Sequence, residues 1–171
     1  MEKISYSCEL LHLIKLKLHY IEVPPSILLA LNNGEEKGKF KQRVLITLNK
    51  TIEWQAGIVA LGEGKGYITV SKERMKKLGI TLYDQVEVTL EKDLSEYGHE
   101  FPIELEEVLI QDPEARIRFD QLSPGKQRTL IYYILQVKDS DKRIERSLLF
   151  MNNLKRAPEG KETMRILFGK E

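Results

Sequence analysis

Basic side chains at short spacing are the residues of this sequence that could do chemistry on a ligand. The segment "SKERMKK" places Lys72, Arg74, Lys76 and Lys77 close together, opposed only by Glu73. Clustered lysine and arginine neutralise phosphates, so these four residues are nucleic-acid candidates. The loop "KGKFKQR" adds four more basic residues between positions 37 and 43. A solvated amphipathic face also explains these lysines, so DNA binding is an alternative here and not the favoured reading.

A second group could bind a small anion. Lys138, Ser140, Arg143 and Arg146 gather where one predicted helix ends and the next begins. Unpaired amides and the helix dipole favour an anion at a helix N-terminus, and the serine hydroxyl would add a donor. The competing interpretation is that Arg143 and Arg146 form ion pairs on their own surface, with Asp139, Asp141 or Glu145. We favour that structural interpretation and keep the four residues as anion or ligand candidates.

Metal binding has little support in the sequence. His12 and His19 are expected on one strand, where their odd spacing would point them to opposite faces. Cys8 and His12 could share a face, but two ligands do not complete a site. His99 falls in an expected linker. The residues therefore indicate no metal site.

Catalytic patterns are missing as well. The glycine-rich "GEGKG" lacks the Lys-Ser/Thr and the helix of a phosphate-binding loop, and there is no G-x-S-x-G elbow. A general acid needs a carboxylate in an apolar pocket. The acidic side chains between positions 91 and 107 are instead expected to form a polar face: Glu91, Asp93, Glu96, Glu100, Glu104, Glu106 and Glu107. No catalytic residue and no cofactor are predicted, so the chain reads as a binding protein, with a DNA-binding regulator second and a small-molecule enzyme third.

Composition allows a sizeable core without indicating a specific partner. The 171 residues are 42% hydrophobic and carry a formal net charge of +1, which gives no whole-chain case for nucleic acid or membrane binding. Residues 91–120 carry 10 acidic and 3 basic side chains, the sharpest shift in charge. Cys8 is the only cysteine, and no run of about 20 apolar residues is present. We expect a soluble cytoplasmic protein, a monomer or weak homo-oligomer, whose partner is a small anionic ligand or another protein.

Strands and short helices are predicted across the first half. Residues 13–23 alternate with period two and predict one strand, and 24–34 predict a short helix. Further strands are expected at 44–50 and 51–61, with Trp54 in the core, followed by a hairpin turn at 62–66. Ser71 should cap a helix that ends at Gly79. Val86, Val88 and Leu90 should face inward on the last strand.

A degenerate internal repeat organises these elements. Placing residue 21 over residue 68 aligns two strand–helix–strand units, at about 21–50 and 68–92. Ile21 matches Ile68, and Val44, Ile46 and Leu48 match Val86, Val88 and Leu90. One such unit cannot bury its apolar face alone, but two can do so against each other. The helix of the first unit has no basic residue, so a two-fold DNA reader would lack one of its two surfaces.

Four helices and a tail are predicted in the second half. The helices correspond to "PIELEEVLIQ", "PEARIRFDQL", "SPGKQRTLIYYILQVK" and "DSDKRIERSLLFMNNLKR", with Ser123 capping the third and Asp139 or Ser140 the fourth. In the tail, Met164, Ile166 and Phe168 alternate with other residues. That period predicts a short strand that docks on an apolar groove or sheet edge, either of its own barrel or of a neighbouring molecule.

Two family resemblances follow from these residues. "GEGKGYITVSKERMKKLGI" and "DQVEVTLEKD" resemble the swapped-hairpin barrel of AbrB-type proteins, here with both units in one chain. Residues 105–154 resemble the YdeI or OmpD-associated bacteriocin-protection domain, through "FDQLSP", an aromatic helix ending at Lys138, and the Arg143–Arg146 pair. Ser147 departs from the isoleucine usual in that family. The resemblances imply a bacterial α+β protein: a single-chain AbrB-like double-split β-barrel at 1–98, a linker at 99–102, a helical domain at 103–157 and a tail at 158–171. They imply a role in stress or bacteriocin protection without an established activity.

Overall fold

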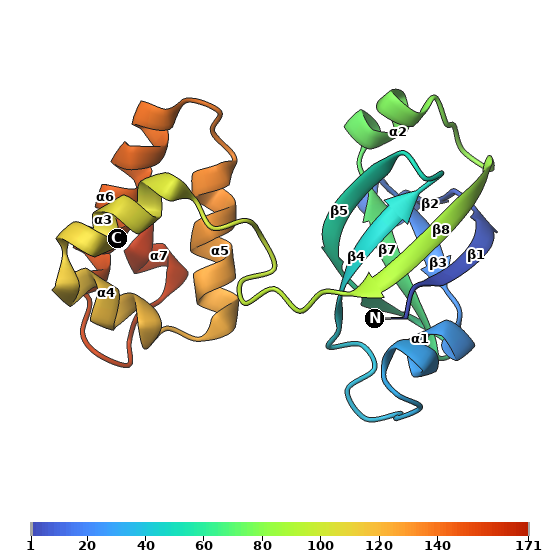
Figure 1. Ribbon diagram of the computed structural model, residues 1–171, viewed down its shortest axis with the longest axis horizontal. Helices are drawn as coiled ribbons and strands as arrows, with labels where there is room; N and C mark the ends of the chain where they lie inside the picture. Colours follow the sequence, from blue (N-terminus) through green and yellow to red (C-terminus); the bar gives the residue numbers. More distant parts are fainter. Residues whose placement is uncertain (1, 171) are drawn as a thin grey trace. The chain divides into compact units, whose positions relative to one another are not determined.

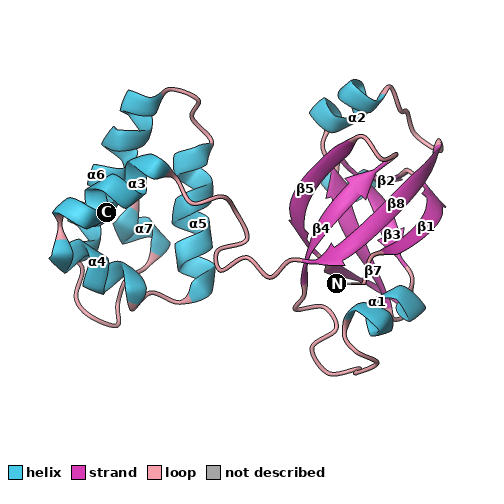
Figure 2. Cartoon of the chain, viewed as in Figure 1, coloured by secondary structure: helices cyan, strands magenta, loops and turns pink. Residues whose placement is uncertain are grey.

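A computed structural model describes residues 2–170 of the chain. It separates into two compact units, divided between Leu94 and Ser95. The N-terminal unit holds all the strands and two short helices, and the C-terminal unit is helical (Figures 1 and 2). Strands therefore precede helices along the chain, which confirms the expected α+β class in this general form.

The N-terminal unit contains two four-stranded antiparallel sheets. The first has the strand order β1 (Ile4–Glu9), β8 (Gln85–Lys92), β4 (Arg43–Leu48), β5 (Ile52–Gly57). The second has the order β2 (Leu11–Leu13), β3 (Leu18–Val23), β7 (Lys65–Val70), β6 (Val59–Gly62). Within residues 2–170 the strand pairings form these two sheets and no closed ring of strands. The closed AbrB-like barrel expected from the resemblance is therefore not established.

The internal repeat appears directly in the strand pairing. β3 pairs with β7 so that Ile21 lies opposite Ile68, the residue it matches in the repeat. β4 pairs with β8, and Ile46 lies opposite Leu90 while Leu48 lies opposite Val88. Exchanging the two units reproduces both registers, so each unit covers the apolar face of the other within one chain. The helices α1 (Pro25–Leu31) and α2 (Lys72–Leu78) occupy matching positions between the paired strands.

Alternation along the strands builds the core between the sheets. The inward side chains of β4 and β8 are at most 1% exposed, namely Val44, Ile46, Leu48, Val86, Val88 and Leu90. Ile21, Val23 and Ile68 close the core from the second sheet, and Leu28 and Leu31 of α1 cover one end. Burying such a side chain contributes about 1.5–3 kcal/mol as an upper estimate. The inward placement predicted for the last strand is confirmed.

The single strand predicted over residues 13–23 was wrong. The chain leaves β2 through a 3₁₀ turn at Ile14–Leu16, and Lys17 takes a left-handed φ of 51° before β3 begins. Ile14 and Leu16 are 79% and 60% exposed, although their alternation favoured an inward face. The turn pairs His12 with His19 across β2 and β3, and their rings stack 4.7 Å apart. The two histidines therefore lie side by side and not on opposite faces.

The strand predicted over residues 51–61 is divided between the sheets. β5 belongs to the first sheet and β6 to the second, and buried Ile58 lies between them. Gly66 on β7 makes this crossing sterically possible, because a Cβ there would lie 2.5 Å from Cγ2 of Ile58. Trp54 is half-buried at the edge of the core, so its expected core position is only partly realised.

The predicted turns and caps around the second unit are present. Glu63 and Gly64 have φ values of 53° and 75° in the tight hairpin between β6 and β7. The Ser71 hydroxyl accepts a hydrogen bond from the amide of Arg74 at 3.2 Å, which caps α2. Gly79 ends that helix with a φ of 65°. These three features follow from local chemistry alone, so the sequence predicts them reliably.

The C-terminal unit packs five helices around one core. They are α3 (Ile103–Gln111), α4 (Pro113–Asp120), α5 (Pro124–Leu135), α6 (Ser140–Arg156) and α7 (Met164–Leu167). Phe119 lies at the centre, fully buried among leucines and isoleucines of the other helices. Ser123 and Asp139 cap α5 and α6 as expected. Ser147 is fully buried, and its hydroxyl donates to the carbonyl of Arg143 at 2.8 Å, so the helix itself satisfies this polar group.

The tail is helical, and the predicted strand was wrong. α7 forms one short turn capped by Thr163, whose hydroxyl accepts from the amide of Ile166 at 3.3 Å. Leu167 is fully buried in the core of the helical unit, while Ile166 is 37% exposed. Phe168 lies against the rings of Tyr133 and Phe150. The tail docks on its own unit through a helical turn, with an inward residue that the alternating pattern did not select.

Candidate functional site

Helix α2 carries the four nucleic-acid candidates, but they do not form one free basic face. Arg74 lies flat against Trp54, with its guanidinium carbon 4.4 Å from the ring centroid. Burial lowers the pKa of Arg74, against the opposing charge of Glu73. Lys77 pairs with Glu73 at 3.2 Å along the helix. Lys72 and Lys76 are exposed and form no ion pair with any described residue. Half of the expected basic cluster is thus occupied by contacts within the protein.

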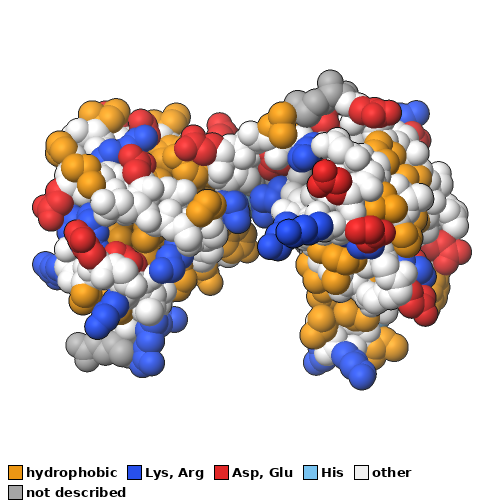
Figure 3. Space-filling view, turned by 90° about the horizontal axis from the view of Figure 1, so that it is seen from below, with side chains coloured by type: hydrophobic (Ala, Val, Ile, Leu, Met, Phe, Trp, Pro, Cys, Tyr) orange, Lys and Arg blue, Asp and Glu red, His pale blue; other side chains and the backbone are white. Residues whose placement is uncertain are grey.

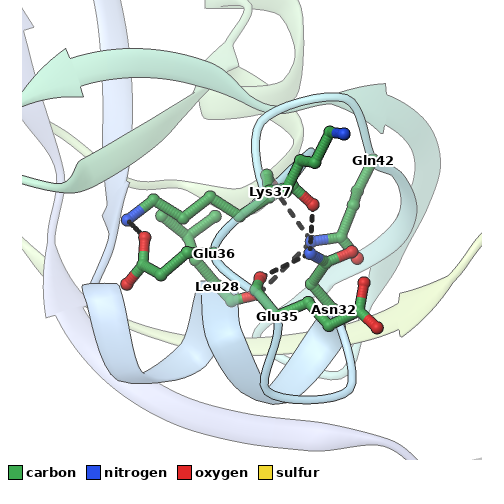
Figure 4. Close-up of polar contacts among 7 residues, drawn as sticks. Leu28, Asn32, Glu35, Glu36, Lys37 and Gln42 are labelled. Carbon is green, nitrogen blue, oxygen red and sulfur yellow. Dashed lines mark hydrogen bonds and ion pairs between the residues drawn. The ribbon is translucent and has the colours of Figure 1, made fainter.

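The charged loop before β4 is also held by its own contacts (Figure 4). The Asn32 amide donates to the carbonyls of Glu35 and Lys37, at 2.5 and 3.1 Å. The Gln42 amide donates to the carbonyls of Leu28 and Lys39, at 3.3 and 3.0 Å. Lys39 pairs with Glu36 at 2.6 Å and its side chain is only 13% exposed. The loop therefore adds fewer free positive charges than its sequence indicates.

The anion candidates of the helical unit lie near one another, but a carboxylate of the protein already engages two of them, Ser140 and Arg143. Glu104 of α3 accepts a hydrogen bond from the Ser140 hydroxyl at 3.0 Å and lies 3.8 Å from the Arg143 guanidinium. Arg143 also donates to the carbonyl of Val137 at 2.7 Å, and Arg146 to the carbonyl of Tyr133 at 2.5 Å. Both arginines thereby satisfy carbonyls at the end of α5. Lys138 is exposed.

The contacts at the junction between α5 and α6 stabilise the packing of the helices. The expected partners of the arginines were acidic residues of the same surface. The contacts found are with backbone carbonyls and with Glu104, an acidic residue from a helix distant in sequence. Free carbonyls at the end of a helix need donors, and an arginine fork supplies them. The cluster therefore joins α3, α5 and α6.

An apolar groove lies between α3 and α6, and the sequence alone did not reveal it. It has a volume of about 280 Å³ and a floor of Val108, Ile144, Leu148 and Met151. Three carboxylates line it: Glu104, Glu107 and Asp112. Gln111 and Asn152 complete the lining, which contains no basic residue. We call this set of residues the α3–α6 groove.

The carboxylates of the α3–α6 groove differ in their partners. Glu104 is engaged by Ser140 and Arg143, and Asp112 pairs with Lys155 at 2.5 Å. The hydrogen bonds from Lys155 and from the amide of Ala115 hold the pKa of Asp112 below its usual value. Glu107 is exposed and forms no ion pair with any described residue. It is the carboxylate of the rim that remains open to a ligand.

A broader hollow of about 580 Å³ lies on the other side of α3. Tyr97, Phe101, Ile103 and Ile110 provide its apolar lining. Glu107 borders this hollow as well as the α3–α6 groove, so it stands on the ridge between them. Burial, followed by the charge of Glu96, raises the pKa of Tyr97, which keeps its hydroxyl protonated. Apolar side chains are visible at the surface of this unit among charged ones (Figure 3).

The exposed apolar residues of α3 follow a helical spacing. Ile103 and Ile110 are 81% and 65% exposed, and Glu107 lies between them on the same face. Ile144 and Leu148 of α6, at 38% and 45%, face the neighbouring groove. The seven-residue spacing of Ile103 and Ile110, which places both on one face of a helix, was visible in the sequence. It was overlooked because the acidic residues around it indicated a solvated face.

The described part of the chain offers no metal centre. Within residues 2–170, no three histidine, cysteine or carboxylate side chains lie close enough to hold an ion. The stacked His12 and His19 form a pair without a third ligand. None of the described helices is long and apolar enough to cross a membrane.

A third hollow lies beside α2 in the N-terminal unit. It measures about 320 Å³ and includes Lys17, His19, Lys72 and Arg74 in its lining. Burial, and then the charges of His12 and Lys72, lower the pKa of His19. The fold thus brings two of the nucleic-acid candidates, Lys72 and Arg74, together with Lys17 and His19 from a distant segment of the chain.

The two family models that match the chain fall on either side of the boundary between its units. Residues 99–157 match the family model of the bacteriocin-protection, YdeI or OmpD-associated proteins. Residues 12–90 match the model of a domain of unknown function, DUF1905. No curated protein matches the chain significantly. The α3–α6 groove lies wholly inside the first matched segment, and the hollow beside α2 lies inside the second.

Proposed function

We propose that the chain is a non-enzymatic binding protein whose helical unit captures a basic, amphipathic peptide segment in the α3–α6 groove. The single observation that carries the proposal is the groove itself, an apolar floor from two helices whose lining holds carboxylates and no basic residue. An amphipathic helix laid into such a groove places apolar side chains at positions i, i+3, i+4 and i+7 on the floor. Its basic residues then meet the acidic rim.

Charge complementarity selects the peptide class. Residues 95–120 carry 8 acidic and 2 basic side chains. Both arginines there have partners: Arg116 pairs with Glu106 and Asp120, and Arg118 with Glu162. An unpaired carboxylate on the rim attracts cations and repels anionic groups, which gives selectivity and speeds association. Exposed Glu107 is the residue placed to meet a lysine or arginine of the ligand.

The exposed floor also argues for an occupant. Leu148 and Ile144 on the floor of the groove remain 45% and 38% exposed. Exposed apolar side chains that lie together inside a polar rim are typical of an interaction surface. Burying these side chains under a peptide gives a favourable free energy of binding, and the polar rim sets the orientation of the peptide.

Bacteriocin protection is the biological setting that we infer for this binding. The name of the family matched at residues 99–157 supports it, and the capture of a peptide is a way in which a binding protein could protect. An AbrB-like DNA-binding regulator is the alternative. It is less well supported, because Lys77 of α2 is paired with Glu73 and α1 carries no basic residue.

Fluorescence anisotropy tests the proposal on the full chain. The probe is a labelled synthetic peptide of about 18 residues, with leucines at one helical face and lysines on the other, long enough to form a helix when bound. We expect saturable binding that weakens with added salt. Glu107→Lys and Leu148→Lys should each weaken it by about tenfold or more, near 1.4 kcal/mol.

Matched controls keep the result interpretable. Glu100→Lys makes the same charge change outside the groove, and Ile117→Lys replaces an isoleucine that is 60% exposed on α4. Both should bind the peptide almost as the parent does. Equal binding by all four variants, or equal binding of a peptide with glutamate in place of lysine, would contradict the proposal. Comparing survival of bacteriocin-treated cells that express the parent chain or Glu107→Lys then tests the biological setting.

A further inference from the structure

The hollow beside α2 has a chemistry opposite to that of the α3–α6 groove. Its lining brings together Lys17, His19, Thr69, Lys72 and Arg74, and contains no carboxylate. Its volume of about 320 Å³ is large enough for a small oxyanion with some of its water. We call it the cationic hollow.

Strand pairing explains why these residues meet. Lys17 ends the turn that precedes β3, and Lys72 follows the end of β7. β3 and β7 are antiparallel, with His19 opposite Val70 and Tyr20 opposite Thr69. The start of one strand therefore lies beside the end of the other. Two lysines that are far apart in sequence thus border one hollow.

The two lysines of the cationic hollow are not neutralised by the protein. Lys17 and Lys72 form no ion pair with described residues, in contrast to Lys77, which pairs with Glu73 outside the hollow. The pKa of His19 is lowered by burial and then by the charges of His12 and Lys72. The guanidinium of Arg74 is fixed in place by Trp54.

We propose that the cationic hollow is a binding site for a phosphate-type oxyanion, held by Lys17, Lys72 and Arg74 with Thr69 as a hydroxyl donor. Ammonium and guanidinium groups form charge-assisted hydrogen bonds to phosphate, and several together fix it within one place. The ligand is a free phosphate group, of an inorganic or small-molecule ester, or a phosphate of a nucleic-acid backbone. The chemistry recognised is the same in both cases.

The test uses the full chain with inorganic phosphate and pyrophosphate as probes. Binding is followed by amide chemical shifts and by the emission of Trp54, the only tryptophan, which lies against Arg74. We expect saturable changes at residues 17–19 and 69–74. Lys72→Gln and Lys17→Asn should weaken binding by about tenfold, since asparagine tolerates the left-handed conformation at position 17. Lys76→Gln, an exposed lysine of the same helix outside the hollow, should leave binding unchanged.

Competition with a double-stranded oligonucleotide distinguishes the two sources. If a backbone phosphate is the ligand, DNA binds at low salt and inorganic phosphate displaces the DNA. Lys72→Gln then weakens DNA binding, and Lys76→Gln does not. If the source is a free phosphate group, pyrophosphate binds and DNA does not. The proposal is overturned if neither probe binds at millimolar concentration, or if Lys72→Gln and Lys76→Gln reduce binding equally. Amide spectra of every variant in the absence of ligand establish that each one is folded.

Discussion

The guanidinium carbon of Arg74 lies 4.4 Å from the centroid of the Trp54 ring, so a residue of α2 stacks on a residue of β5. Trp54 itself is half-buried at the edge of the core. The stack attaches the short helix α2 to the first sheet, although the strand that leads into α2 belongs to the second. It therefore holds the helix and the cationic hollow in one position.

Replacing Arg74 with leucine removes the cation–π contact while keeping an apolar stem over the ring. We expect the free energy of unfolding to fall by about 1 kcal/mol, within the range of about 0.5–2 kcal/mol for such pairs. Emission from Trp54 should shift, because its indole loses the charged neighbour. Chemical denaturation followed by fluorescence measures both effects. Lys76→Gln is the matched control, and a fall of the same size in that variant would contradict a role for the stack.

Asp112 gives the helical unit an acid-sensitive contact. It caps α4 by accepting from the amide of Ala115 at 3.0 Å, and it pairs with Lys155. Because its pKa is lowered from 3.8 in the folded state, its contribution to stability is fully present above that value. The contribution is lost as the pH falls through the lower folded pKa.

Asp112→Asn separates the charge from the cap, since asparagine caps a helix as well as aspartate does. The variant should be less stable than the parent at neutral pH, and the difference should begin to shrink near pH 3.8 and disappear below the lower folded pKa. Asp112→Ala removes the cap too and should cost about 1 kcal/mol more at neutral pH. Thermal unfolding across pH measures these differences. A stability difference between the parent and Asp112→Asn that stays constant as the pH is lowered would contradict this role of the charge.

Leu167 anchors the tail to the helical unit. It is fully buried, so Leu167→Ala should cost about 2–5 kcal/mol in stability. Ile166 is 37% exposed on the same short helix, and Ile166→Ala should cost much less. Urea denaturation of the two variants measures the contrast. Equal effects would show that α7 is not docked by the residue that the structure places inward.

Cys8 should react slowly with alkylating reagents. Burial, followed by the charge of Glu22, raises the pKa of its thiol to about 11. The thiolate is the reactive form, and it is scarce at pH 8 when the pKa is this high. Mass spectrometry after iodoacetamide treatment should show little modification of the native chain and rapid modification in denaturant. Rapid modification of the folded chain would contradict this placement of Cys8.

Most of the correct predictions of the fold rest on local chemistry and on strong periodicity of apolar residues. Val86, Val88 and Leu90 alternate cleanly because one face of β8 is buried, and Ser71 and Gly79 mark a helix that needs no distant contact. The matching of Ile21 with Ile68 also succeeded, because the two units must bury the same kind of face against each other.

The failures lie where tertiary contacts override a local pattern. Ile14 and Leu16 continue the alternation of the strand beside them, yet the chain turns there and exposes both. The four-residue helix α7 is too short for periodicity to distinguish it from a strand. The basic residues of the candidate sites were easily found, but their partners were not. Glu104, Trp54 and the carbonyls of α5 approach them only in the folded chain.

The groove was missed for a related reason. Its floor combines α3 with α6, and no stretch of sequence contains both. Its rim residue Glu107 belongs to an acidic run that solvation alone could explain. Only the packing of the two helices shows that apolar residues lie between those carboxylates.

Peptide capture by the α3–α6 groove is tested most directly by an amide NMR titration of the full chain with the unlabelled basic amphipathic peptide. The account predicts saturable shifts centred on Val108, Ile144 and Leu148, with Glu107 among the affected residues and Ile117 unaffected. Glu107→Lys should need about tenfold more peptide to reach the same shifts. Shifts that do not saturate, that spread evenly over the surface, or that appear equally with the acidic peptide would contradict it.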